Sequence, residues 1–158
     1  MNRFELNENK NDNGPLILIF TEGTIIGPKK WIDFFNLKKY APIKNCISKI
    51  NKWEKQGFQV VYLTSRKDYS SALEIKNILT QFKFPGSYLY YRTDKEKYKD
   101  VVEKLKPVIL IEDNCRSIGG KWQMAITFVD HKIKEKIKSI VVREFHGIDE
   151  LPDNLIDY

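Results

Sequence analysis

Two neighbouring carboxylates, Glu112 and Asp113, follow an apolar run and are of the residue type that binds a cation. Carboxylates that leave a buried strand side by side repel each other and lose solvation, so they require a cation or several hydrogen-bond donors. Mg²⁺ takes one or two protein carboxylates and keeps several of its waters, which suits such a loop. Capping of a helix by Asp113 or Asn114 is the plainer alternative. Of the two, we favour a cation or anion site.

Hydroxyl and basic side chains that can hold a phosphoryl group occur in two other stretches. Thr64 and Arg66 follow the apolar run Gln59–Leu63, and a hydroxyl at the end of a buried strand can hydrogen-bond a phosphate oxygen together with the N–H groups of the next helix. Taken alone, Thr64 is better explained as a helix cap. Lysines recur between positions 95 and 106. We choose Lys99 to neutralise a phosphate, because it opens the amphipathic helix that leads back to Glu112.

These polar stretches stand where predicted strands end. Six apolar runs have the length and composition of strands: Leu16–Phe20, Gln59–Leu63, Ser87–Tyr91, Val108–Ile111, Ala125–Val129 and Ile140–Val142. Amphipathic helices are predicted between them, over Lys44–Lys55, Ser70–Phe82 and Lys97–Leu105. This alternation predicts an α/β fold, a three-layer Rossmann-like parallel sheet of five to six strands with helices on both faces. In such sheets, ligands bind beyond the carboxyl ends of the strands.

The loop after the first run, Phe20-Thr21-Glu22-Gly23-Thr24, carries the most information in the chain. Its apolar strand ends in a tight turn above the predicted sheet. In their order and spacing, the four stretches together resemble the haloacid dehalogenase (HAD) superfamily from Pro15 to about Val129, and in particular its compact members with little or no cap. The middle of the chain, with QVVYLTSRKD and YYRTDKEKYKDVVEKL, is also loosely similar to the phosphatase half of bacteriophage polynucleotide kinase.

The resemblance assigns a role to each stretch. The first loop of the HAD superfamily reads Asp-x-Asp-Gly-Thr, which places Phe20 at the first aspartate and Glu22 at the second. In the family, the first aspartate attacks phosphorus and the second acts as general acid and base, so Glu22 is implied as acid and base. The remaining roles implied by the resemblance are phosphate binding by Thr64, Arg66 and Lys99, and Mg²⁺ binding by Asp113 with Glu112 beside it.

Phe20 interrupts this pattern, because a phenyl ring can neither attack phosphorus nor bind Mg²⁺. The first aspartate position is therefore degenerate, and Glu22 is one methylene longer than the aspartate it replaces. We favour a catalytically silent or severely weakened HAD-fold protein that retains a partial phosphate and metal pocket. The alternative is an active Mg²⁺-dependent phosphohydrolase, acting on nucleotides or nucleic-acid 3′-ends, that uses metal-activated water or Thr21. A second alternative is a protein that binds nucleic-acid ends.

Composition agrees with a globular protein of one domain. The chain has 158 residues, of which 42% are apolar and 30% charged. No apolar run approaches the about 18 residues that span a bilayer, so we predict no membrane partner. The polar start predicts a flexible arm over residues 1–14, before a single HAD-like domain over 15–158. Cys46 and Cys115 lie far apart without CxxC spacing, which favours free thiols in a cytoplasmic protein.

Charge and aromatic residues are compatible with the proposed kinds of partner. The net charge of +6 and the sequence pI of about 9.2 suit a phosphorylated small molecule or a nucleic-acid end, but they also suit a lysine-rich surface without a partner. Trp31, Phe34 and Phe35 follow the first loop at helical spacing. They could line a substrate entrance, but we favour packing in the core. The oligomeric state is not predicted.

Overall fold

A six-stranded sheet forms the centre of the protein in a computed structural model, which describes residues 1–7 and 13–156. The strands lie in the order β1 (Asn2–Glu5), β6 (Tyr88–Tyr91), β5 (Gln59–Leu63), β2 (Leu16–Phe20), β7 (Ile109–Asp113) and β8 (Lys138–Val142). Neighbouring strands from β6 to β8 are parallel, and β1 is antiparallel to β6. The carboxyl ends of β2, β5 and β7 therefore open at one edge of the sheet.

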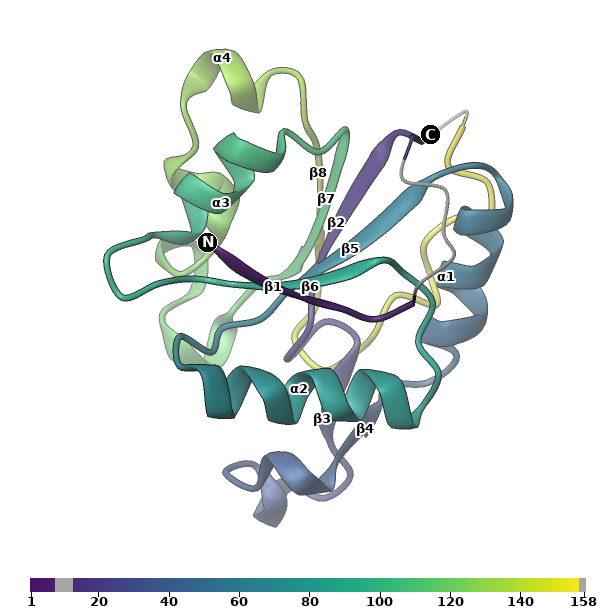
Figure 1. The fold of residues 1–158 in the computed structure, drawn as a ribbon, viewed down its shortest axis with the longest axis vertical. Coiled ribbons are helices and arrows are strands. Elements are labelled where there is room, and N and C mark those ends of the chain that lie inside the picture. Colours follow the sequence, from purple (N-terminus) through teal and green to yellow (C-terminus); the bar gives the residue numbers. More distant parts are fainter. Residues whose placement is uncertain (8–12, 157–158) are drawn as a thin grey trace.

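Helices cover both faces of this sheet, as predicted (Figure 1). On one face, α1 (Cys46–Lys55) and α2 (Tyr69–Gln81) pack against Ile17 and Ile19 of β2 in one buried cluster. On the other, α3 (Tyr98–Leu105) and residues 125–137, which include α4 (His131–Lys134), form a second cluster with Leu18. Because side chains alternate along a strand, one strand supplies both cores. The three-layer α/β fold is confirmed.

The predicted flexible arm over residues 1–14 is wrong for residues 2–5, which form the edge strand β1. The ring of Phe4 stacks on Tyr91, with centroids 5.2 Å apart, and lies 5.3 Å from the ring of Tyr69. These apolar contacts compensate for the ordering of a terminal segment, and pairing with β6 satisfies an otherwise open sheet edge. Residues 8–12 of the predicted arm lie outside the described residues.

The predicted strand Ala125–Val129 is also wrong, because Ala125–Phe128 forms a 3₁₀ turn that packs on α3. The backbone N–H groups of Ala125 and Ile126 donate to the Glu112 carboxylate, at 2.7 and 3.1 Å, instead of to a neighbouring strand. A short apolar run cannot by itself distinguish a buried strand from a buried turn of helix. Here the carboxylate of Glu112, which comes from β7, accepts the two N–H groups and stabilises the turn.

A small hairpin of β3 (Ile26–Pro28) and β4 (Tyr40–Pro42) carries residues 29–39, which we call the flap. The flap lies away from the main sheet (Figure 1). Core packing of its aromatic residues is therefore wrong for Trp31 and Phe35, which are 71% and 94% exposed. Phe34 is half-buried and contacts Trp31, with centroids 5.3 Å apart. The helical spacing of these aromatic residues does not indicate whether another element packs over the flap, and among the described residues none covers Trp31 or Phe35.

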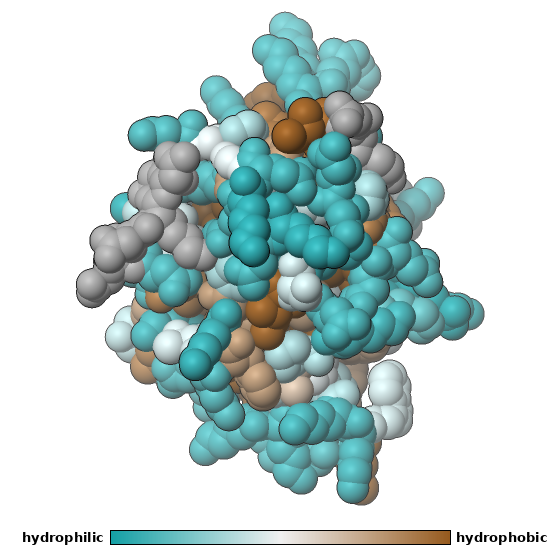
Figure 2. All heavy atoms as spheres, turned by 90° about the vertical axis from the view of Figure 1, so that its right-hand side faces the viewer, coloured by the Kyte–Doolittle hydropathy of each residue, from teal (hydrophilic) through white to brown (hydrophobic). Residues whose placement is uncertain are grey.

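The face that carries α1 and the C-terminal segment is covered mainly by hydrophilic side chains, with hydrophobic ones between them (Figure 2). No helix within residues 1–7 and 13–156 has the length and apolar character needed to cross a membrane. Both cysteines are free, Cys46 buried and Cys115 half-buried. Gly57 follows α1 with a φ of +91°, a conformation that glycine adopts without strain and that is common just after a helix ends.

Candidate functional site

A cavity of about 720 Å³ lies at the carboxyl ends of β2, β5 and β7, where the sequence predicts a ligand site. Its walls come from the loops after these strands, from α3 and from the flap. Among the candidate residues from the sequence, those that line it are Phe20, Glu22, Phe34, Phe35, Arg66, Glu112 and Asp113. Thr21, Thr64 and Lys99 are not in its walls.

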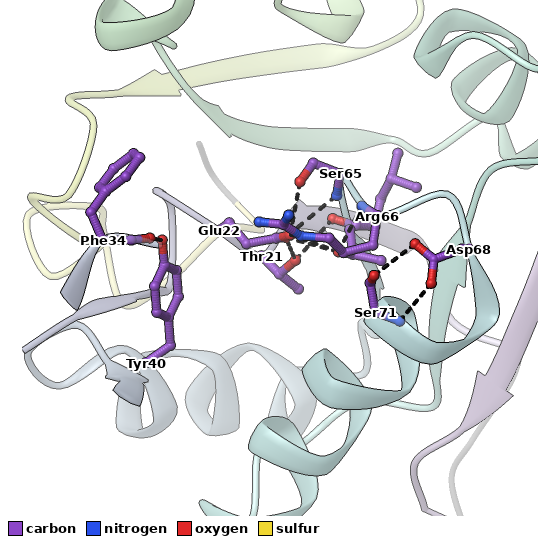
Figure 3. A network of polar contacts seen from close by, with 10 residues as sticks. Thr21, Glu22, Phe34, Tyr40, Ser65, Arg66, Asp68 and Ser71 are labelled. Atoms are coloured by element: carbon purple, nitrogen blue, oxygen red, sulfur yellow. Dashed lines mark hydrogen bonds and ion pairs between the residues drawn. The ribbon is translucent and has the colours of Figure 1, made fainter. Parts of the chain in front are cut away.

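Glu22 is held by three consecutive residues after β5, Thr64, Ser65 and Arg66, which we call the cradle. The Thr64 hydroxyl lies 2.8 Å from Oε1 and 3.0 Å from Oε2 of Glu22. Ser65 donates its hydroxyl to Oε1 at 2.8 Å and its backbone N–H to Oε2 at 3.4 Å. Arg66 Nε lies 3.1 Å from Oε1. Figure 3 shows Ser65 and Arg66 pointing toward Glu22, whose side chain is only 12% exposed.

Two features of the cradle were not predicted from the sequence. Ser65 is not among the site residues that the sequence predicts, although it stands between the two predicted phosphate holders in Thr64-Ser65-Arg66. The predicted acid and base, Glu22, itself accepts the hydrogen bonds of the predicted phosphate holders. The adjacency of the two loops at the sheet edge follows from parallel pairing of β2 with β5. Nothing in the residue spacing indicates that Glu22 turns toward these donors.

Thr21 is fully buried behind the cavity wall. Its hydroxyl contacts Glu22 Oε2 and also lies 3.3 Å from the Leu63 carbonyl oxygen. The hydroxyl therefore has a neighbouring carboxylate but no open path to a ligand in the cavity. Attack by Thr21 would require the loop to rearrange.

Asp113 is anchored in the opposite wall by the first loop. Thr24 Oγ1 accepts from the backbone N–H of Asp113 at 3.1 Å and donates to Oδ1 at 3.2 Å, and Cys115 N–H donates to Oδ2 at 2.9 Å. Burial raises the pKa of the Asp113 carboxyl, and these donors oppose the rise. Gly23, with a φ of +82°, approaches so closely that a Cβ there would lie 2.9 Å from Asp113 Oδ1. The first loop and the acidic loop thus interlock.

Glu112 leaves β7 on the other face of the strand, because successive side chains alternate. Glu112 is only 2% exposed, and its carboxylate accepts hydrogen bonds from the backbone N–H groups of Ala125 and Ile126. Burial raises the pKa of Glu112 to about 7. The predicted carboxylate pair therefore does not act as one unit, and Glu112 fixes the turn.

Phe20 presents only carbon to the cavity, at the position to which the HAD resemblance assigns the first aspartate. Its ring packs edge-on against Tyr98 of α3, with centroids 5.1 Å apart and planes at 73°. The guanidinium group of Arg92 lies over the ring of Tyr98, with its central carbon 3.6 Å from the centre of that ring. Phe20 is 9% exposed and lines the cavity while belonging to the α3-side core. This ring therefore contributes packing and no oxygen to the site.

Lys99 lies on α3, outside the cavity. Its Nζ is 3.9 Å from both Asp100 Oδ1 and Glu103 Oε1, so its charge is turned toward its own helix. The cations that line the cavity within the described chain are Lys38 of the flap and Arg66. Helical spacing placed Lys99 on α3 correctly but did not show which side of α3 meets the cavity.

The residues present do not fit the Mg²⁺ site that the HAD resemblance implies. Phe20 has no oxygen, Glu22 faces the cradle and Glu112 faces the 125–126 turn. Asp113 remains as one carboxylate at the expected place. Within residues 1–7 and 13–156, no group of three or more His, Cys, Asp or Glu side chains has the arrangement to hold a metal ion.

Comparison with known proteins relates the chain to others by fold. No family model matches the chain, and no curated protein matches it. It is similar to a chain of the Pnkp1/Rnl/Hen1 RNA repair complex, with 14% identity and a TM-score of 0.57 over 88% of this chain and 46% of that one. A second structure of the Pnkp1/Rnl/Hen1 complex gives 13% identity and a TM-score of 0.57 over 87% and 49%.

A third match is the D,D-heptose 1,7-bisphosphate phosphatase from Burkholderia thailandensis, with 12% identity and a TM-score of 0.48 over 84% of this chain and 94% of that one. The chain spans about half the length of the two chains from the Pnkp1/Rnl/Hen1 complexes. At these identities the likeness concerns the fold. The likeness to the two chains from the Pnkp1/Rnl/Hen1 complexes, together with the mostly parallel six-stranded sheet, supports a Rossmann-like α/β fold.

Proposed function

We propose that this protein is a phosphatase-like protein of the HAD type that binds a ligand in its cavity without hydrolysing phosphate esters. The observation that carries the proposal is Phe20, whose ring packs on Tyr98 at the end of β2 where a nucleophilic carboxylate is required. Loss of a covalent nucleophile lowers the rate of such reactions by several orders of magnitude. The scaffold and part of the pocket remain, so binding is the function that the geometry supports.

The surroundings of Phe20 support the same proposal. Thr21, the nearest hydroxyl along the chain, is fully buried and does not line the cavity. Glu22 accepts hydrogen bonds from each residue of the cradle, so its carboxylate is not poised to remove a proton from a water in the cavity. Asp113 alone does not make a Mg²⁺ site. An active phosphohydrolase with a different nucleophile is therefore the weaker hypothesis.

We expect purified protein with Mg²⁺ to release no phosphate from p-nitrophenyl phosphate, from a panel of nucleotides or from 3′-phosphorylated oligonucleotides. A turnover number at least about 10⁴-fold below a typical 10 s⁻¹ is expected, because no group in the cavity forms the covalent intermediate. Malachite-green detection of free phosphate measures this directly. Turnover that disappears in both Glu22→Gln and Asp113→Asn would contradict the proposal. Turnover that survives both changes would indicate a contaminating phosphatase.

The flap favours nucleic-acid binding as a second candidate function. A hollow of about 500 Å³ beside it is lined by four lysines: Lys29, Lys30, Lys38 and Lys39. Trp31 and Phe35, both largely exposed, lie in the same segment. Lysines that contact phosphates next to rings that stack on bases are typical of surfaces that bind single-stranded nucleic acid. Two structures of similar fold come from complexes of RNA repair proteins, which makes RNA the first probe.

We expect a fluorescent single-stranded RNA to bind at 50 mM salt with an affinity that falls steeply as salt rises. Each phosphate that a lysine neutralises on a single strand contributes about −0.7 to the slope of log K against log salt. Replacing Lys30 and Lys38 together by Gln should therefore make the slope shallower by about 1.4. Lys52→Gln on α1, where the lysine pairs with Asp153, is the matched control. Absence of binding at low salt would end this candidate.

A further inference from the structure

We infer that Glu22 is a built-in occupant of an oxyanion site, which it closes to phosphate in this protein. The cradle of Thr64, Ser65 and Arg66 has the donors for a tetrahedral oxyanion, and removal of the Glu22 carboxylate would open it to inorganic phosphate. The inference rests on the proposed function because both concern ligand binding in the same cavity. It further specifies that the unmodified protein excludes phosphate from the cradle.

The first step is the convergence of the donors. Two hydroxyl groups, one backbone N–H and one guanidinium N–H from three consecutive residues point at one carboxylate. These four donors make five contacts with Oε1 and Oε2, and four of the contacts lie between 2.8 and 3.1 Å, within the usual range of N–H···O and O–H···O hydrogen bonds. A hydroxyl, a backbone N–H and an arginine are also the groups with which proteins hold phosphate. The carboxylate thus takes the place of an external anion.

The second step is the exclusion of a competing anion. Glu22 is 12% exposed and is linked to the chain, so no ligand displaces it by simple competition at low concentration. A phosphate that entered beside it would meet its negative charge at short range, which is unfavourable. Carboxylates also outnumber cations around the cavity within the described residues. The carboxylates are Glu22, Glu74, Glu112, Asp113 and Glu144, and the cations are Lys38 and Arg66.

The third step is what remains when the carboxylate is removed. Glu22, Ser65 and Arg66 all line the cavity of about 720 Å³, so the space that Glu22→Ala vacates is continuous with it. Thr64, Ser65 and Arg66 would then present donors without their acceptor. Water can enter from the cavity and satisfy these donors, which keeps the variant folded. Phosphate, with several acceptor oxygens and negative charge, satisfies them better than water.

The test is calorimetric titration of inorganic phosphate into the full chain at pH 7.5 without divalent cations. We expect no binding by the unmodified protein and binding by Glu22→Ala with a dissociation constant at least about tenfold lower than any weak value found for the unmodified protein. Glu144→Ala is the matched control. Glu144 also lines the cavity, but it accepts from Ser117 rather than from the cradle. Removing it takes away the same charge without opening the oxyanion site.

A second variant shows that binding occurs at the cradle. Glu22→Ala combined with Arg66→Gln should lose the phosphate affinity that Glu22→Ala gains. If Glu22→Ala does not fold, as judged by circular dichroism, Glu22→Ser replaces it, because its short side chain also leaves the cradle open and carries no charge. Phosphate binding by the unmodified protein with the affinity of the variant would overturn the inference. Equal binding by Glu144→Ala, or none by a folded Glu22 variant, would also overturn it.

Failure of this inference is distinguishable from failure of the proposed function. The titration measures binding of phosphate, whereas the proposed function is tested by release of phosphate from esters. If the unmodified protein binds inorganic phosphate but releases no phosphate from esters, only the role of Glu22 is overturned.

Discussion

Raising the pH from about 5 to 8 is expected to lower the free energy of unfolding by about 3 kcal/mol through Glu112 alone. Burial raises the pKa of this carboxyl from its ordinary 4.5 to about 7. Between these values the folded protein holds a proton that the unfolded chain has released. The folded state therefore binds more protons, and stability falls as the pH rises through this window and levels off above about 7.

Urea unfolding of the unmodified protein and of Glu112→Gln at several pH values checks this expectation. The variant side chain does not titrate, so most of the pH dependence between 5 and 8 should disappear. Asp113, whose pKa is also raised by burial, adds a pH dependence of the same sign. Asp68, Glu96 and Asp153 have lowered pKa values, so the stability that they contribute is lost at lower pH, outside this window. Identical pH profiles for the two proteins would contradict the role of Glu112.

The position of the site could be predicted from the sequence because it follows from strand order. The runs Leu16–Phe20, Gln59–Leu63 and Val108–Ile111 have the apolar character of buried parallel strands, and they became β2, β5 and β7. The carboxyl ends of neighbouring parallel strands meet at one edge, so the residues after them had to lie close together. That argument needs only the order of elements and no knowledge of any side-chain direction.

The directions of the side chains could not be predicted in the same way. Glu112 and Asp113 are adjacent in sequence but point to opposite faces, one toward the 125–126 turn and the other toward Thr24. Lys99 opens a helix that was predicted, yet its charge faces Glu103 on that helix. These outcomes depend on partners that come from distant parts of the chain. A pattern of residue types within one segment does not contain them.

Phe20 and Glu22 depart in related ways from the pattern that the HAD resemblance implies. At position 20 an aromatic ring joins the core through Tyr98, and at position 22 a longer carboxylate reaches the cradle across the cavity edge. The first provides no oxygen to the cavity, and the second occupies donors that could otherwise bind a ligand. Gly23 and Thr24 hold Asp113 beside these two residues. Placing aspartate at both positions should therefore create a carboxylate cluster around Asp113.

Phe20→Asp combined with Glu22→Asp is expected to lower the free energy of unfolding by about 3 to 5 kcal/mol in the absence of metal, because Phe20 is buried against Tyr98. Addition of Mg²⁺ should return part of this loss, since the new carboxylate and Asp113 can share the cation. At a concentration about 100-fold above the dissociation constant, the return amounts to about 2.7 kcal/mol. Urea unfolding with and without 10 mM Mg²⁺, about the concentration that a submillimolar site requires, measures both effects.

Phe20→Asn combined with Glu22→Asp separates the metal from the packing. Asparagine removes the same aromatic contacts and has nearly the same size as aspartate, but it brings no charge. In the absence of Mg²⁺, the asparagine variant should therefore have about the same free energy of unfolding as the aspartate variant. Adding Mg²⁺ should change this free energy little. An equal Mg²⁺ response in both variants would mean that the cation binds elsewhere on the surface. No response in a folded aspartate variant would mean that Asp113, held by Thr24 and Cys115, no longer faces a cation position.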